Sequence, residues 1–245
     1  MDLPQVALRP FGRAEDLELE FGGGGRPGLV TALLARCSDS PGAQFWWTQS
    51  VGTRIAALLR LVALTESTDH LLVQARCTES ACVTAFEMEL PLAALVDQTH
   101  DPGPLQVVLP DERTVSLRLP TGEDVHNWRG AQYASRQEAA AAMIGALVID
   151  GQVTVADESA LAAALAVWDP LVAFRVSCQC PVCGADNNVR VDLESIAIAR
   201  LNARQQVLLR DVHQLASHYG WTESEVLAIA PSRRARYLEL IEEAR

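Results

Sequence analysis

The chain has 245 residues, of which 49% are hydrophobic, and it carries a formal net charge of −11 at pH 7. A chain of this length and composition can bury a sizeable core in one or two domains, and its charge disfavours non-specific binding to nucleic acids. All 20 basic residues are arginine, which excludes mechanisms that require a lysine, such as a P-loop or a Schiff base.

The first hundred residues predict an arm, two helices and two strands. Residues 1–28 mix Pro, Gly and charged residues, so we expect a loosely held arm. A short helix is expected over Leu29–Arg36, and apolar residues at helical spacing predict a longer one over Val51–Leu64. The two strands are expected over Leu71–Arg76 and Val83–Leu90.

The stretch at 99–104, rich in Pro and Gly, marks the start of an inserted module at 100–170. Its first part predicts a hairpin with strands over Val107–Leu109 and Thr114–Leu119. Its second part predicts three helices, with caps at Thr121, Ser135 and Asp157. A further strand is expected after the module, over Leu171–Val176.

The C-terminal segment, 193–245, predicts consecutive helices. The pattern indicates a long helix over Leu193–Tyr219, which Gly220 ends, and a capping box from Thr222 to Glu225 begins the next one. This segment contains as many arginines as acidic residues, so the whole net charge of −11 resides in residues 1–192.

Five of the six cysteines lie in two clusters, Cys77-Thr-Glu-Ser-Ala-Cys82 and Cys178-Gln-Cys180-Pro-Val-Cys183-Gly184. Each cluster is followed by a short alternating stretch typical of a strand. In a reducing compartment such clusters favour metal over disulfides, and four thiolates suit a tetrahedral zinc ion. The sequence therefore predicts a structural Zn²⁺ bound by four ligands, namely Cys77, Cys82, Cys180 and Cys183.

One ligand is ambiguous, because Cys178-x₄-Cys183 repeats the spacing of Cys77-x₄-Cys82 and Cys178 could replace Cys180. The CPxCG form, in which Gly allows the turn, favours Cys180. Cys37 stands alone and is expected to be a core or surface thiol.

The five histidines form no catalytic constellation, and we expect neither catalytic nor cofactor-binding residues. Asp124 and His126 could be interpreted as the dyad of a hydrolase. An acid in the first turn of a helix explains Asp124 equally well, because it stabilises the helix N-terminus.

Several segments together resemble a known family. They are Arg118–Trp128 (R-x-PTG-x-D-xxxW), Asp169-Pro170-Leu171 before the CPxCG cluster, Leu208–Glu225 and Pro231–Leu238. Over residues 50–245 the chain is similar to baseplate hub assembly chaperone-like proteins of contractile-tailed phages and phage-derived contractile injection systems. The first cysteine pair departs from the usual CPxCG form, with four residues between its cysteines and no Gly after them.

This resemblance implies a non-enzymatic structural or assembly component of a baseplate, with hub, spike, tape-measure or other baseplate proteins as partners. It implies a protein of the bacterial producer cell's cytoplasm that can be incorporated in a phage tail-like particle. No secretory or membrane-spanning pattern is expected, since the longest apolar stretch, Ile55–Leu64, is short and broken by Arg60. The alternative is a nucleic-acid-associated zinc-ribbon protein.

The expected fold class is α+β, with a two-knuckle zinc-ribbon-like β core, an inserted hairpin/helix module and a C-terminal helical arm. The expected segments are an N-terminal arm (1–45), a first helix and knuckle half (46–99), the module (100–170), a second knuckle half (171–192) and the helical arm (193–245).

Overall fold

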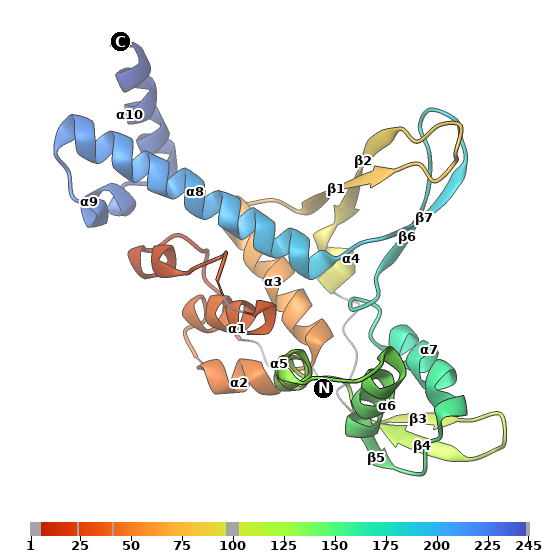
Figure 1. Ribbon diagram of the computed structural model, residues 1–245. Coiled ribbons are helices and arrows are strands. Elements are labelled where there is room, and N and C mark those ends of the chain that lie inside the picture. The colour runs from red at the N-terminus through yellow and green to blue at the C-terminus, as the bar shows by residue number, and fades with distance from the viewer. Residues whose placement is uncertain (1–5, 24, 41, 97–102, 244–245) are drawn as a thin grey trace.

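The computed structural model describes residues 6–23, 25–40, 42–96 and 103–243 (Figure 1). Its helices are η1 (Ala14–Glu18), α1 (Arg26–Arg36), α2 (Ala43–Thr48), α3 (Val51–Glu66), α4 (Leu92–Val96), α5 (Gly122–Gly130), α6 (Arg136–Leu147), η2 (Val155–Asp157), α7 (Glu158–Trp168), α8 (Leu193–Tyr219), α9 (Glu223–Ala228) and α10 (Pro231–Glu243). Its strands are β1 (His70–Arg76), β2 (Ala85–Pro91), β3 (Leu105–Val108), β4 (Thr114–Leu117), β5 (Val148–Asp150), β6 (Arg175–Gln179) and β7 (Asp186–Arg190).

The strands form small antiparallel sheets, ordered β1-β2, β3-β4-β5 and β6-β7. Long helices combined with small sheets confirm the α+β class. Among the described residues, no helix is both long and apolar enough to cross a membrane.

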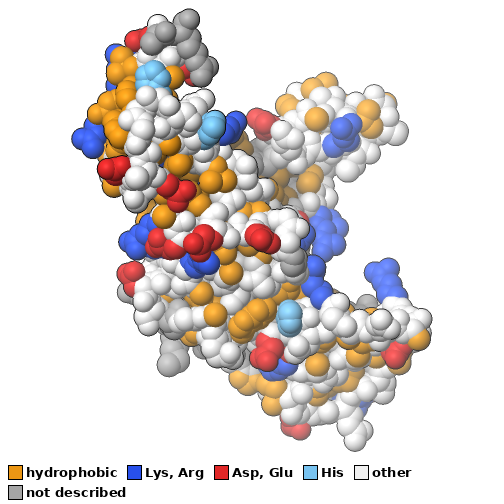
Figure 2. Space-filling model, turned by 60° about the vertical axis from the view of Figure 1, so that its left-hand side comes forward, with side chains coloured by type: hydrophobic (Ala, Val, Ile, Leu, Met, Phe, Trp, Pro, Cys, Tyr) orange, Lys and Arg blue, Asp and Glu red, His pale blue; other side chains and the backbone are white. Residues whose placement is uncertain are grey.

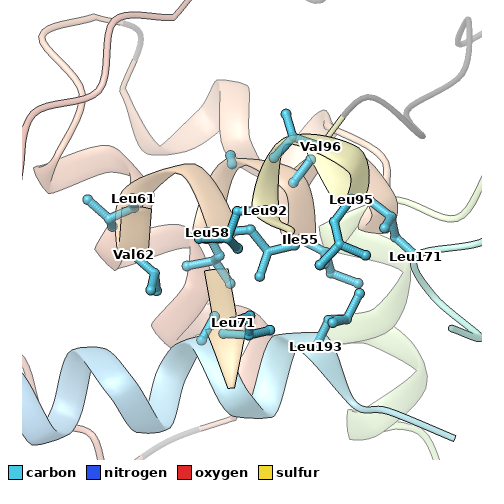
Figure 3. Packing of buried hydrophobic residues seen from close by; sticks show 14 of the residues in the cluster. Ile55, Leu58, Leu61, Val62, Leu71, Leu92, Leu95, Val96, Leu171 and Leu193 are labelled. Atoms are coloured by element: carbon cyan, nitrogen blue, oxygen red, sulfur yellow. The ribbon is translucent and has the colours of Figure 1, made fainter. Parts of the chain in front are cut away.

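The main hydrophobic core lies among helices and not inside the two cysteine-bearing hairpins. Its centre is α3, whose Leu58, Leu59 and Leu61 are fully buried. Side chains from α1, α4 and the first turns of α8 pack around α3, and Leu71 joins them from β1 (Figure 3). Burial of these apolar side chains is the main favourable contribution to folding. The expected β core is therefore corrected to a helical core to which the hairpins are attached at their bases.

The described part of the N-terminal segment, which starts at residue 6, is packed against the rest of the chain, contrary to our expectation of a loosely held arm. Phe11 is 3% exposed, and the buried Asp16 accepts bonds from the guanidinium of Arg9 at 2.7 and 2.9 Å. Gln205 of α8 donates hydrogen bonds to the carbonyls of Leu17 and Leu19. Apolar side chains of the same segment also pack against the main core, namely Val6, Leu8, Leu19 and Phe21. They are scattered among Pro, Gly and charged residues, so pattern reasoning misses them.

A smaller second core forms where α6 and α7 cover the β3-β4-β5 sheet. Val115, Leu117 and Leu161 are fully buried there. The hairpin and the three helices expected in residues 100–170 are present, but β5 was missed because a three-residue strand has no detectable alternation. Asp157 does not cap α7, since its carboxylate binds Thr154 and Arg113 instead.

Two polar joints connect the second core to the main one. The first is backbone pairing, in which the N–H of Val51 donates to Pro120 O at 2.9 Å and that of Gly122 donates to Gln49 O at 3.1 Å. The second is the Asp169 carboxylate, which accepts the N–H of Gly52 in the first turn of α3 at 3.0 Å. Such a bond satisfies one of the backbone donors that a helix start leaves without an intrahelical partner.

The second joint explains an error in the predicted strand over Leu171–Val176. Because Asp169 is held against α3, the chain turns through residues 170–173, and β6 begins only at Arg175. A carboxylate contact across 117 residues of sequence leaves no local signal.

The C-terminal helices agree with the sequence pattern. The long helix α8 spans Leu193–Tyr219 as expected, and Gly220 ends it in the left-handed conformation at φ 73°. Thr222 and Glu225 form the expected capping box of α9. In Figure 1, α8 extends away from the main core and carries α9 and α10 at its far end. A third small core, around Leu215, Val226 and Ile241, holds these helices together.

Candidate metal centre

Two β hairpins bring the cysteine clusters together at their tips. The β1–β2 hairpin pairs from His70↔Pro91 to Arg76↔Ala85, and its tip carries Cys77 and Cys82. The β6–β7 hairpin pairs from Arg175↔Arg190 to Gln179↔Asp186, and its tip carries Cys180 and Cys183. The tips lie together at one end of the molecule, far from α10 (Figure 1).

The four sulfur atoms converge on one point between the hairpins. All of them lie within 4.8 Å of one another. The Sγ atoms of Cys77 and Cys183 are 3.7 Å apart, and those of Cys82 and Cys180 are 3.8 Å apart. A disulfide would require about 2.05 Å. In contrast, a tetrahedron with vertices about 2.3 Å from its centre, the Zn–S distance, has edges of about 3.8 Å. The arrangement fits four thiolates around one metal ion.

Equivalent backbone bonds close the two knuckles. The N–H of Cys77 donates to Thr84 O at 2.9 Å, and that of Cys180 donates to Ala185 O at 2.9 Å. Each bond joins the first cysteine of a knuckle to the second residue after its last cysteine. The sulfurs are therefore placed by backbone geometry, and the two loops act alike despite their different lengths.

The protein environment favours the thiolate form at two of the four sulfurs. Hydrogen bonding to the Thr84 side chain and backbone N–H lowers the pKa of Cys82 to about 7. The backbone N–H groups of Cys183 and Val182 lower the pKa of Cys180. Backbone donors of this kind stabilise charge on sulfur.

Cys183 behaves in the opposite way. The N–H of Ala185 favours its thiolate, but desolvation and the three neighbouring sulfurs outweigh that bond and raise its pKa to about 12. Four negative charges cannot share this small volume without a cation. A metal ion removes the conflict, because coordination deprotonates a thiol outright.

The two other cysteines lie outside this group. Cys178 lies within β6, paired with Asn187 and two residues before Cys180, and its sulfur is not one of the four that converge. The structure thus brings Cys180, and not Cys178, to the centre. Cys37 is fully buried at the end of α1, where desolvation raises its pKa to about 12, so it is a core thiol.

Asn187, which the sequence analysis did not single out, links the two hairpins beside the sulfurs. Its Oδ1 accepts bonds from the N–H and the hydroxyl of Thr78 at 2.8 and 2.9 Å. Its Nδ2 donates to Ala185 O at 2.8 Å, and the residue is 3% exposed. The fixed amide orients both knuckles, as groups around metal ligands commonly do. One asparagine in the pattern Asp-Asn-Asn gives no sequence signal for this role.

The first knuckle is strained where the second is not. Val83, which follows Cys82, adopts φ 45°, whereas Gly184, which follows Cys183, adopts φ 73°. Only glycine accepts the left-handed region without a steric penalty, and a β-branched residue is an outlier there. This is the structural consequence of the missing glycine in the first knuckle.

We expect Val83→Gly to stabilise the folded chain by roughly 0.5–1 kcal/mol, since relief of the left-handed strain outweighs the entropy that glycine adds to the unfolded chain. Val83 is 52% exposed, so little packing is lost. The reciprocal change, Gly184→Val, should destabilise the chain. Thermal unfolding of both variants tests this, and a lower midpoint for Val83→Gly would contradict it.

Asp124 and His126, the possible hydrolase dyad, both make contacts that support the fold. Asp124 is held by the Arg118 guanidinium and the backbone N–H of Thr121, and it completes the capping box of α5. The ring of His126 packs against Trp47, 5.2 Å between centroids. His100 lies outside the described residues.

Comparison with protein-family models, curated proteins and solved structures finds no match to this chain. The resemblance to baseplate proteins therefore stays a prediction from the sequence segments.

Proposed function

We propose that this chain is a structural or assembly protein whose two hairpins are joined by a Zn²⁺ ion bound to Cys77, Cys82, Cys180 and Cys183. The observation that carries the proposal is the convergence of four sulfurs from two hairpins about a hundred residues apart, with spacings that suit tetrahedral coordination. Four protein ligands leave no position for water or substrate, so such a site contributes to folding and not to catalysis.

Zinc is favoured over other ions by the ligand type. Four thiolates in tetrahedral geometry suit zinc or iron, whereas Mg²⁺ and Ca²⁺ require oxygen ligands. Zinc has no redox chemistry of its own, and its role here would be to hold the hairpin tips in one orientation.

We further propose that the protein works in the baseplate of a contractile tail or injection system, with hub, spike, tape-measure or other baseplate proteins as partners. Support comes from the segments quoted above. Their residues Gly122 and Asp169 lie at the joints between the two cores, where Gly122 leaves room for the Arg54 guanidinium. Intact joints would hold the two cores in a fixed relative placement, and with them the surfaces that contact partner proteins.

Deletion of the gene in the organism that encodes it tests the baseplate assignment. We expect electron microscopy to reveal no assembled sheathed particles, and we expect a wild-type copy to restore them. Wild-type numbers of particles in the deletion strain would contradict the baseplate assignment while leaving the zinc proposal intact.

A further inference from the structure

Two arginines lie directly opposite each other at the base of the β6–β7 hairpin. Arg175 on β6 is the register partner of Arg190 on β7, so both exposed side chains emerge on the same face. Like charges in this position repel and destabilise a sheet. In the described part of the chain neither guanidinium forms an ion pair with a carboxylate. The arrangement is electrostatically costly unless an anion lies beside it.

The acids close to Arg190 in sequence are already engaged. Asp192 and Glu194, which line the groove described below, both face Arg26, at 2.9 and 3.6 Å. Asp186 accepts a hydrogen bond from Gln179 at 3.2 Å. Arg129 of α5 also acts electrostatically on Glu194. Arg54 of α3 does so as well. Five arginines, at 26, 54, 129, 175 and 190, thus stand against Asp192 and Glu194. This local excess of positive charge belongs to a chain whose net charge is −11.

An open groove of about 440 Å³ adjoins Arg190. Its walls are largely apolar, with Ile55 from α3, Trp128 from α5 and Val172 from the turn after α7. Val172 is 42% exposed. The volume falls in the range of ligand pockets, which favour junctions between structural units. Figure 2 shows basic side chains gathered at the notch between the cysteine-bearing hairpins, above, and the part of the molecule below them that contains the second core.

We propose that this groove binds an acidic peptide segment of a partner protein, with an apolar or aromatic side chain against the Trp128 wall and carboxylates on Arg175 and Arg190. Guanidinium groups bind carboxylates by charge-assisted, often bidentate hydrogen bonds. Local charge complementarity selects an anionic partner, and the apolar walls select a peptide side chain. A nucleic acid would meet repulsion from the rest of the acidic chain.

This inference goes beyond the zinc site and deepens the proposed function, because it gives the chemistry of one partner contact. Selection of random peptides displayed on phage against the full-length, zinc-loaded protein tests it. We expect the enriched peptides to combine acidic residues with an aromatic or large aliphatic one. We expect the double variant Arg175→Gln/Arg190→Gln to bind synthetic copies of them about tenfold more weakly or worse.

The matched control is Arg136→Gln/Arg233→Gln, which removes the same charge from two exposed arginines outside the groove and should bind normally. The double variant Arg175→Gln/Arg190→Gln, the groove variant, should keep its zinc and its thermal midpoint. A failure of the zinc proposal would appear in the zinc content and not in peptide binding, so the two outcomes are distinguishable. Lack of enrichment, peptides without acidic residues, or equal binding by the groove variant would overturn the inference. Tighter binding of single-stranded oligothymidine through the same arginines would overturn it in favour of a nucleic acid.

Discussion

Cys180→Ser should cost the protein both its zinc and a large part of its stability. The purified wild-type chain is expected to contain about one zinc per molecule, bound by four thiolates at about 2.3 Å. A ligand that binds only the folded state, at about 1,000 times its Kd, stabilises that state by about 4 kcal/mol. Its loss should lower the thermal midpoint by about 8–16 °C for a chain of this size.

The matched control for this experiment is Cys178→Ser, the same substitution two residues away. Because the sulfur of Cys178 is not among the four that lie within 4.8 Å of one another, this variant should keep both zinc and midpoint. Elemental analysis and calorimetry provide the two measurements, and a strong chelator should bring the wild type close to Cys180→Ser. Zinc retained in Cys180→Ser but lost in Cys178→Ser would make Cys178 the ligand, and wild-type protein purified without chelator that contains no zinc would remove the metal altogether.

Gly52→Ala should strongly destabilise the folded chain. A Cβ at residue 52 would lie 1.9 Å from Oδ1 of Asp169 and 2.5 Å from its Cγ. Asp169 is 8% exposed and also accepts the Gly52 N–H. Displacement of this carboxylate both strains the packing and leaves a buried charge with fewer partners, at a cost of roughly 2–4 kcal/mol.

Gly145→Ala provides a control in which the expected change in stability has the opposite sign. Gly145 lies inside α6, and a Cβ there would meet nothing within 4 Å. Alanine should therefore stabilise the chain by roughly 0.5–1 kcal/mol through its higher helix propensity. Thermal or denaturant unfolding measures both variants.

A double-mutant cycle identifies the cause of the Gly52→Ala effect. If the clash with Asp169 is responsible, Gly52→Ala should cost much less in an Asp169→Ala background, because neighbouring substitutions are not additive. Equal costs in both backgrounds would show that the Asp169 contact is not the source.

The sequence by itself determined features whose physical cause is local. The long helix α8, its glycine stop and the capping box of α9 follow from hydrophobic spacing and from side chains that satisfy nearby backbone groups. The CPxCG turn likewise presents Cys180 and Cys183 on one loop, because the glycine after them accepts a left-handed backbone.

Only the tertiary structure decided which distant groups meet. It brought Cys77 and Cys82 to the second pair and left Cys178, which is paired within β6, outside the group of four sulfurs. It also placed the Asp169 carboxylate on the first turn of α3 and set Arg175 opposite Arg190. Contacts of this kind depend on chain packing over a hundred residues or on strand register, and neither has a period that a sequence pattern can reveal.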